Sequence, residues 1–172
     1  MTQLGGAARP RRVRRPTTEG LPTMEHEHFA TATYVTYSLE RTLSSEPDAV
    51  WEVVRDFGNV GWIPGATKAV SYDGGPGVGL SRILHNRDQG PIRETLIALS
   101  EADRTITYTV SRNIPFPVNY YCATMRVGED GGKAHVTWSC VYEPEDATPE
   151  QAAAAIEALY NLMLDWIDDF AA

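Results

Sequence analysis

The last 26 residues, "ATPEQAAAAIEALYNLMLDWIDDFAA", constrain the fold of this 172-residue chain more than any other stretch. Thr148 is a candidate N-cap, Pro149 suits the first helical position, and Gln151 completes a capping box. The residues at helical spacing predict one apolar stripe, made of Ile156, Leu159, Tyr160, Met163, Ile167 and Phe170. A helix with such a stripe must cover a large apolar surface, and the rest of the chain has to supply it.

The middle of the chain supplies that surface as strands. Order is expected to begin near Tyr34, where "TYVTYSLERTL" alternates as a first strand, and "SSEPDAVWEVVRDF" starts a helix with Ser45 as candidate N-cap. A second helical turn is expected at residues 59–62. Six short strands separated by turn residues are predicted at 67–72, 79–86, 92–99, 105–111, 120–127 and 134–142.

This order predicts an α+β helix-grip fold. A seven-stranded antiparallel sheet would curl around the long C-terminal helix, with two short helices after the first strand. If sheet and helix do not collapse completely, an internal cavity remains between them. Such cavities are typical sites for small ligands.

Charge and composition limit the possible partners. Residues 1–33 hold five of the 15 basic and three of the 23 acidic residues, so residues 34–172 carry a net charge of −10. A domain this acidic repels nucleic acid, and no 18-residue apolar stretch predicts a membrane span. Residues 1–33 are expected to form a disordered basic tail, either simply solvated or in contact with nucleic acid or anionic lipid. No secretory signal is apparent, so a cytoplasmic location is expected.

Two charges stand inside the predicted strands of "LSRILHNRDQGPIRETLIAL", residues 80–99. Arg82 shares strand parity with Leu84, and Glu94 with Ile92 and Leu96. A three-residue turn at 87–89 would place Arg82 directly opposite Glu94. A five-residue turn would place them diagonally on the same face, and a four-residue turn on opposite faces. The pair could therefore face a cavity, or form a surface ion pair worth less than about 1 kcal/mol.

The segment "VWEVVRDFGNVGWIPG", residues 50–65, resembles the start of SRPBCC proteins of the START-type, polyketide cyclase/dehydrase-like superfamily. The resemblance covers residues 34–172 and implies the helix-grip fold. Members include cyclases, isomerases, lyases, lipid carriers and hormone receptors, so the fold does not select one activity.

"GLSRILHN", "IRETLIALSEADRTITYTV" and "NYYCATMRV" are similar to strands of the plant lachrymatory factor synthases, and more loosely to plant abscisic-acid receptors. The likeness to the synthases implies that Arg82 and Glu94 form a catalytic pair that moves protons. It also implies pocket positions for Tyr108 and for Tyr120, or Tyr121 if the register differs by one.

Other residues are expected around the ligand. Leu84 shares the cavity face with Arg82, and Trp138 is expected near Cys122 on the same face, with Tyr120 near Cys140. Phe116, in "NIPFPV", would form part of an apolar rim. The loop "GGPGVG", residues 74–79, would form a lid over the pocket mouth. His85 and His135 are expected on the outer face. The spacing of His, Cys and carboxylates predicts no metal site, and no cofactor is expected.

Two functions follow. The first is a cofactor-free enzyme that catalyses proton-transfer chemistry (cyclisation, isomerisation or dehydration) on a small, partly apolar ligand, with Glu94 as base, Arg82 stabilising an anion and the tyrosines orienting the ligand. The second is a non-catalytic binding or transport protein for a lipid-like or polyketide-like molecule. The predicted partner is a small molecule, with a homodimer possible. A third, weaker option is a module that recruits another protein when its glycine loop closes on a ligand.

Overall fold

The computed structural model describes residues 33–86 and 90–172. The described residues belong to one compact unit. Apart from Thr33, the predicted basic tail lies outside the described residues.

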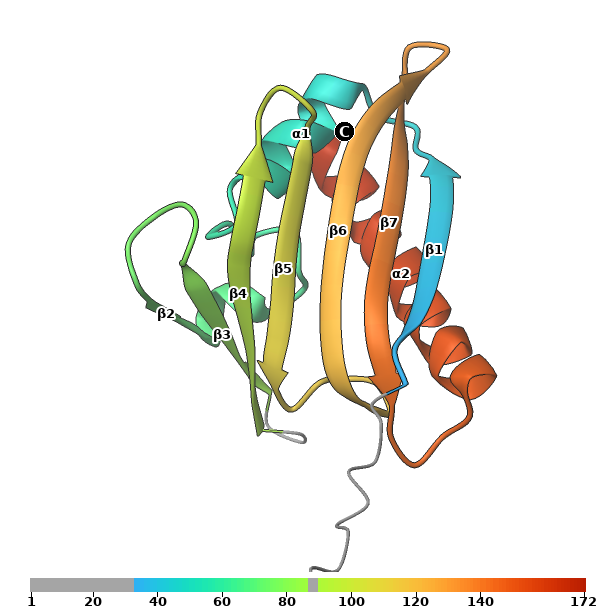
Figure 1. Cartoon of the computed structure of the whole chain (residues 1–172). Coiled ribbons are helices and arrows are strands. Elements are labelled where there is room, and N and C mark those ends of the chain that lie inside the picture. Colours follow the sequence, from blue (N-terminus) through green and yellow to red (C-terminus); the bar gives the residue numbers. More distant parts are fainter. Residues whose placement is uncertain (1–32, 87–89) are drawn as a thin grey trace, which may run out of the picture. The chain divides into compact units, whose positions relative to one another are not determined.

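The described residues form one antiparallel sheet and two α-helices (Figure 1). The strands follow the spatial order β1-β7-β6-β5-β4-β3-β2, so β1 crosses over to pair with β7 and every other neighbour follows in sequence. The elements are β1 (Val35–Thr42), α1 (Pro47–Arg55), η1 (Ala66–Lys68), β2 (Val70–Asp73), β3 (Ser81–Asn86), β4 (Gly90–Ser100), β5 (Thr105–Arg112), β6 (Val118–Asp130), β7 (Lys133–Pro144) and α2 (Pro149–Ala171). The seven-stranded sheet with a long terminal helix is the predicted helix-grip arrangement.

Helix α2 lies along one face of the sheet, with α1 near its C-terminal end (Figure 1). Its capping box is confirmed, because Thr148 Oγ1 accepts from Gln151 N while the Gln151 side chain accepts from Thr148 N. The apolar stripe is confirmed only in part. Leu164 is fully buried although the prediction left it out, and Phe170, placed in the stripe, is 51% exposed.

Both ends of α2 are attached to the rest of the domain. At its start, Tyr142 Oη donates to the Pro149 carbonyl over 3.0 Å. At its end, the Asp168 carboxylate accepts hydrogen bonds from the backbone N–H and hydroxyl of Ser44 and of Ser45, at 2.7–2.9 Å. The predicted N-cap role of Ser45 is therefore wrong. Glu46 is the N-cap of α1 without a side-chain bond, and Ser45 instead joins the C-terminal helix.

The second short helix lies later than predicted. Residues 59–62 form no helix: residues 59 and 60 are irregular and residues 61 and 62 lie in a turn. Trp62 Nε1 donates to the Asn59 carbonyl over 3.1 Å. The 3₁₀-helix η1 follows at Ala66–Lys68, after Gly65, whose φ of +77° suits glycine. No helix in the described part of the chain is both long and apolar enough to cross a membrane.

Candidate functional site

Arg82 on β3 and Glu94 on β4 stand directly opposite each other. Asn86 pairs with Gly90, so the connection has the three residues for which the two charges share a face. Arg82 Nε donates to Glu94 Oε2 over 2.5 Å, and the two side chains are only 6% and 10% exposed. A surface ion pair is therefore the wrong interpretation of these residues. Arg93 and Asp73, whose side chains are 35% and 64% exposed, form that kind of pair over 2.6 Å.

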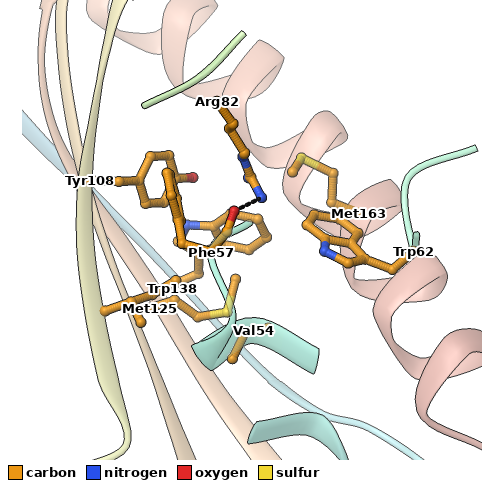
Figure 2. Close-up of a pocket in the computed structure, with 9 residues that line it drawn as sticks. Val54, Phe57, Trp62, Arg82, Tyr108, Met125, Trp138 and Met163 are labelled. Atoms are coloured by element: carbon orange, nitrogen blue, oxygen red, sulfur yellow. Dashed lines mark hydrogen bonds between the residues drawn. The ribbon is translucent and has the colours of Figure 1, made fainter. Parts of the chain in front are cut away.

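The guanidinium of Arg82 is also fixed by the segment that follows α1. Its Nη1 donates to the Phe57 carbonyl over 3.3 Å, and its carbon lies 4.3 Å from the centre of the Phe57 ring (Figure 2). The Trp62 ring lies 5.8 Å from the same carbon. Aromatic faces attract a desolvated guanidinium, so these contacts offset part of the cost of burying the charge.

The ion pair stands between two cavities. The outer cavity has a volume of about 450 Å³ and Glu94 on its wall. The inner one measures about 20 Å³ and has Arg82 on its wall. Met163 of α2 lines both. An outer cavity of this size, largely apolar with one buried carboxylate, has the character of a small-molecule site.

Apolar side chains from several elements form the outer cavity. They come from the 63–69 segment, β3, β4, the β5–β6 loop and α2, and include Ile63, Leu84, Ile92, Pro115, Leu159 and Trp166. Because segments far apart in sequence converge here, sequence reasoning found Leu84 but missed Trp166 and Met163. Their helical spacing with Leu159 was the available signal.

A row of three tyrosines lies beside the inner cavity. Tyr121 and Tyr160 hydrogen-bond through their hydroxyls, and the rings of Tyr108 and Tyr121 lie 6.4 Å apart between centres. Burial is the main cause that raises the pKa of all three phenols. For Tyr108 the negative charge of Glu94 adds to this effect, while Arg82 opposes it. The three groups are therefore neutral hydroxyls near pH 7, able to donate hydrogen bonds.

The structure separates the residues that sequence reasoning placed around the ligand. Tyr108 and Trp138 line the inner cavity, and Leu84 lines the outer one. Phe116 lines neither. It is buried against Tyr121, with ring centres 5.2 Å apart, while its neighbour Pro115 reaches the outer cavity.

The placement of Tyr120 in the pocket is wrong. Tyr120 is 39% exposed and packs edge-on against Tyr34, 5.2 Å between ring centres, whereas Tyr121 points into the core. The pairing of β6 with β7 is irregular between Val118 and Tyr120. The strand parity at this point could not be read from a regular alternation.

The predicted neighbours of the two cysteines are wrong for a related reason. Cys122 pairs with Val141, and Cys140 pairs with Ala123, because β6 and β7 continue to a two-residue turn at Gly131 and Gly132. Both cysteines are free thiols. Burial raises the pKa of each, so neither has the character of an activated nucleophile.

The glycine-rich loop between β2 and β3 is not placed to cover the mouth. Residues 74–79 line neither cavity, and they join the end of β3 opposite to the one that carries Leu84. His85, expected on the outer face, lies at the rim of the outer cavity, where Nε2 shares a 2.8 Å hydrogen bond with Ser71 Oγ. His135 bonds to Thr42 Oγ1 away from both cavities. Within the described ranges, no three His, Cys, Asp or Glu side chains gather closely enough to hold a metal ion.

Comparisons with known proteins support the fold. Among solved structures, norcoclaurine synthase from Thalictrum flavum matches with a TM-score of 0.62 and 18% identity, covering 87% of this chain and 94% of that one. A protein from Nitrosospira multiformis matches with a TM-score of 0.65 and 23% identity, covering 80% of this chain and 97% of that one. At these identities the likeness shows the fold alone.

The sequence comparison is more specific. No curated protein sequence matches the chain significantly. The family model described as "Polyketide cyclase / dehydrase and lipid transport", however, matches residues 34–167, nearly the whole described domain. This chain therefore belongs to the polyketide cyclase/dehydrase and lipid transport family of the SRPBCC superfamily.

Proposed function

We propose that the protein is a cofactor-free enzyme that catalyses proton transfer on a small, partly apolar ligand, as in a cyclisation, isomerisation or dehydration. The observation that carries this proposal is the buried Arg82–Glu94 pair, with the Glu94 carboxylate on the wall of the 450 Å³ cavity. Glu94 acts as the general base. Arg82 orients the carboxylate and stabilises negative charge that develops on the ligand.

The surroundings support these roles. A guanidinium has hydrogen-bond donors and a positive charge but no acceptor, so Arg82 supplies charge and hydrogen bonds. Its contacts to Glu94 and Phe57 fix its position before a ligand binds, and charges fixed in a site that excludes water act strongly on a transition state. A related fold is known to hold such ligands, since one norcoclaurine synthase structure is a complex with dopamine and hydroxybenzaldehyde.

The base can be tested without knowing the natural substrate. 5-Nitrobenzisoxazole is a small apolar compound whose ring opens when a base removes one carbon-bound proton. We expect the protein to accelerate this opening, and Glu94→Gln to lose at least about 10²-fold of the acceleration, a typical contribution of a general base. Asp73→Asn is the matched control, because Asp73 pairs with the neighbouring Arg93 on the exposed face. Equal rates for Glu94→Gln and the wild type would end the assignment.

A binding or transport function is the second candidate. The apolar lining of the outer cavity and the lipid transport members of the family favour it. In that case Arg82 would hold a polar group of the cargo. Native mass spectrometry of freshly purified protein separates the two functions. A binding protein would retain one ligand unchanged, and Glu94→Gln would alter only its affinity.

A further inference from the structure

The indole nitrogen of Trp138 is a buried donor with no hydrogen-bond partner among the described residues. Trp138 is 1% exposed, and its ring stacks on Tyr160 with centres 4.2 Å apart and an angle of 11°. The stack fixes the direction of the N–H. Buried donors are nearly always satisfied, so an unpaired one in a fixed direction indicates a partner that the protein itself does not supply.

This nitrogen belongs to the wall of the inner cavity, together with Tyr108 and Arg82. Figure 2 shows the nitrogen edge of the Trp138 ring on the side of the Tyr108 hydroxyl. A hydrogen-bonding interaction from Trp138 lowers the pKa of Tyr108, against the larger effect of burial, although the contact does not have the geometry of a full hydrogen bond. The Tyr108 hydroxyl therefore lies close to this donor without satisfying it. An indole N–H, a neutral phenol and a guanidinium, all of them donors, thus border one small space.

The volume limits what the space can hold. About 20 Å³ fits a single water-sized group, since one water needs about 10–15 Å³ by the same measure. The occupant must also accept hydrogen bonds, because Trp138 and Arg82 have no acceptor atom in their polar groups. One oxygen atom satisfies both conditions.

We propose that the inner cavity is a binding site for one acceptor oxygen of the ligand, a carbonyl oxygen, held by Trp138 Nε1, the Tyr108 hydroxyl and Arg82. A water occupies the same position in the free protein and is displaced by the ligand. The remainder of the ligand lies in the outer cavity. The substrate class is therefore a compact apolar ketone or aldehyde with its carbonyl at one end.

The arrangement also gives Glu94 a defined task. This assignment rests on the proposed function, because it joins the oxygen site to the base. Arg82 lines the inner cavity while its partner Glu94 lines the outer one, so a carbonyl in the first places its adjacent carbon near the carboxylate. Removal of a proton from that carbon moves the electron pair onto the oxygen, giving an enolate that the three donors stabilise. Met163, whose side chain is flexible, lines both cavities.

The test uses two probes that differ by one carbonyl oxygen, indane and 1-indanone. Their dissociation constants are measured by displacement of the fluorescent apolar dye N-phenyl-1-naphthylamine. Trp138→Phe keeps an aromatic ring on Tyr160 and removes the donor. We expect it to lower the preference for 1-indanone over indane by about 3- to 10-fold, the usual value of one hydrogen bond. Trp51→Phe, the same change at an indole that lines neither cavity and donates to Glu101 over 3.0 Å, is the control and should leave the preference unchanged.

Tyr108→Phe provides a second variant that removes only a hydroxyl, and it decides the test if Trp138→Phe fails to fold. A crystal structure of the wild type with 1-indanone should show the carbonyl oxygen within hydrogen-bond distance of Trp138 Nε1, and a structure without it one water there. An unchanged preference in both variants, or a carbonyl directed elsewhere, would overturn the proposal. The readout is binding, so the oxygen site can fail while Glu94 still opens 5-nitrobenzisoxazole, and the reverse.

Discussion

Removing one member of the Arg82–Glu94 pair should destabilise the protein much more than removing both. The two side chains are almost completely buried and are joined over 2.5 Å. Arg82→Leu would leave a carboxylate, and Glu94→Leu a guanidinium, in a site that water barely reaches. The double variant Arg82→Leu/Glu94→Leu leaves no buried charge at this position.

The magnitude follows from the burial. Two unit charges about 4 Å apart attract by roughly 4 kcal/mol at an effective dielectric constant near 20. Breaking a buried pair on one side costs about 3–5 kcal/mol, while replacing both members by apolar residues is often neutral or stabilising. At about 2–4 °C per kcal/mol for a domain of this size, each single variant should lower Tm by about 6–20 °C.

Urea unfolding followed by tryptophan fluorescence measures these free energies. We expect large losses for the two single variants and a double variant close to the wild type, so that the coupling between positions 82 and 94 is several kcal/mol. The double variant should also lack the Glu94-dependent opening of 5-nitrobenzisoxazole despite its stable fold. If the losses of the two single variants simply add in the double variant, the pair is not energetically coupled and the reasoning is refuted.

Three further predictions concern stability and binding. Burial raises the pKa of the Asp168 carboxyl, but the hydrogen bonds from Ser45 and Ser44 together lower this pKa below its usual value. The carboxylate therefore stabilises the fold near neutral pH. This stabilisation disappears as the pH falls through the folded-state pKa, below about 3.9. Asp168→Ala should thus lower the free energy of unfolding by about 1.5–3 kcal/mol at pH 7 and differ little from the wild type near pH 2. The control, Asp169→Ala on the exposed side of α2, should lower it little at either pH. Chemical denaturation at both pH values checks this. Thr148→Ala should cost about 1 kcal/mol in the same assay, because it removes one half of the capping box; a loss near zero would show that the box contributes nothing. Tyr120→Ser should leave the affinity for N-phenyl-1-naphthylamine unchanged. Leu84→Asp should weaken this affinity at least about tenfold, because the apolar dye would desolvate the new carboxylate. A large effect of Tyr120→Ser would place Tyr120 at the ligand after all.

Local patterns determined most of the fold. Alternation and turn residues predicted all seven strands, and the capping box placed the start of α2 at the correct residue. Side chains alternate strictly along regular strands, so whether Arg82 and Glu94 share a face depended only on the number of residues in the turn between their strands.

The errors lie where local pattern is not decisive. The parity of Tyr120 depended on an irregularity in β6, and the neighbours of Cys122 depended on how far two strands extend before they turn. The bond between Ser45 and Asp168 joins residues 123 positions apart, which no local signal reveals. The two cavities could not be predicted for the same reason, since their walls come from segments that only tertiary packing brings together.

The attachment of α2 at both ends has a consequence for ligand selection. Tyr142 anchors the start of the helix at Pro149, and Asp168 anchors its end to the segment between β1 and α1. A helix fixed in this way cannot swing away from the sheet to admit a larger molecule. The upper limit on ligand size is therefore set by the rotamers of Leu159 and Met163 and by the 63–69 segment, all of which line the outer cavity. Evolution of a new substrate range in this scaffold can proceed through these few positions while the helix, the sheet and the buried ion pair stay in place.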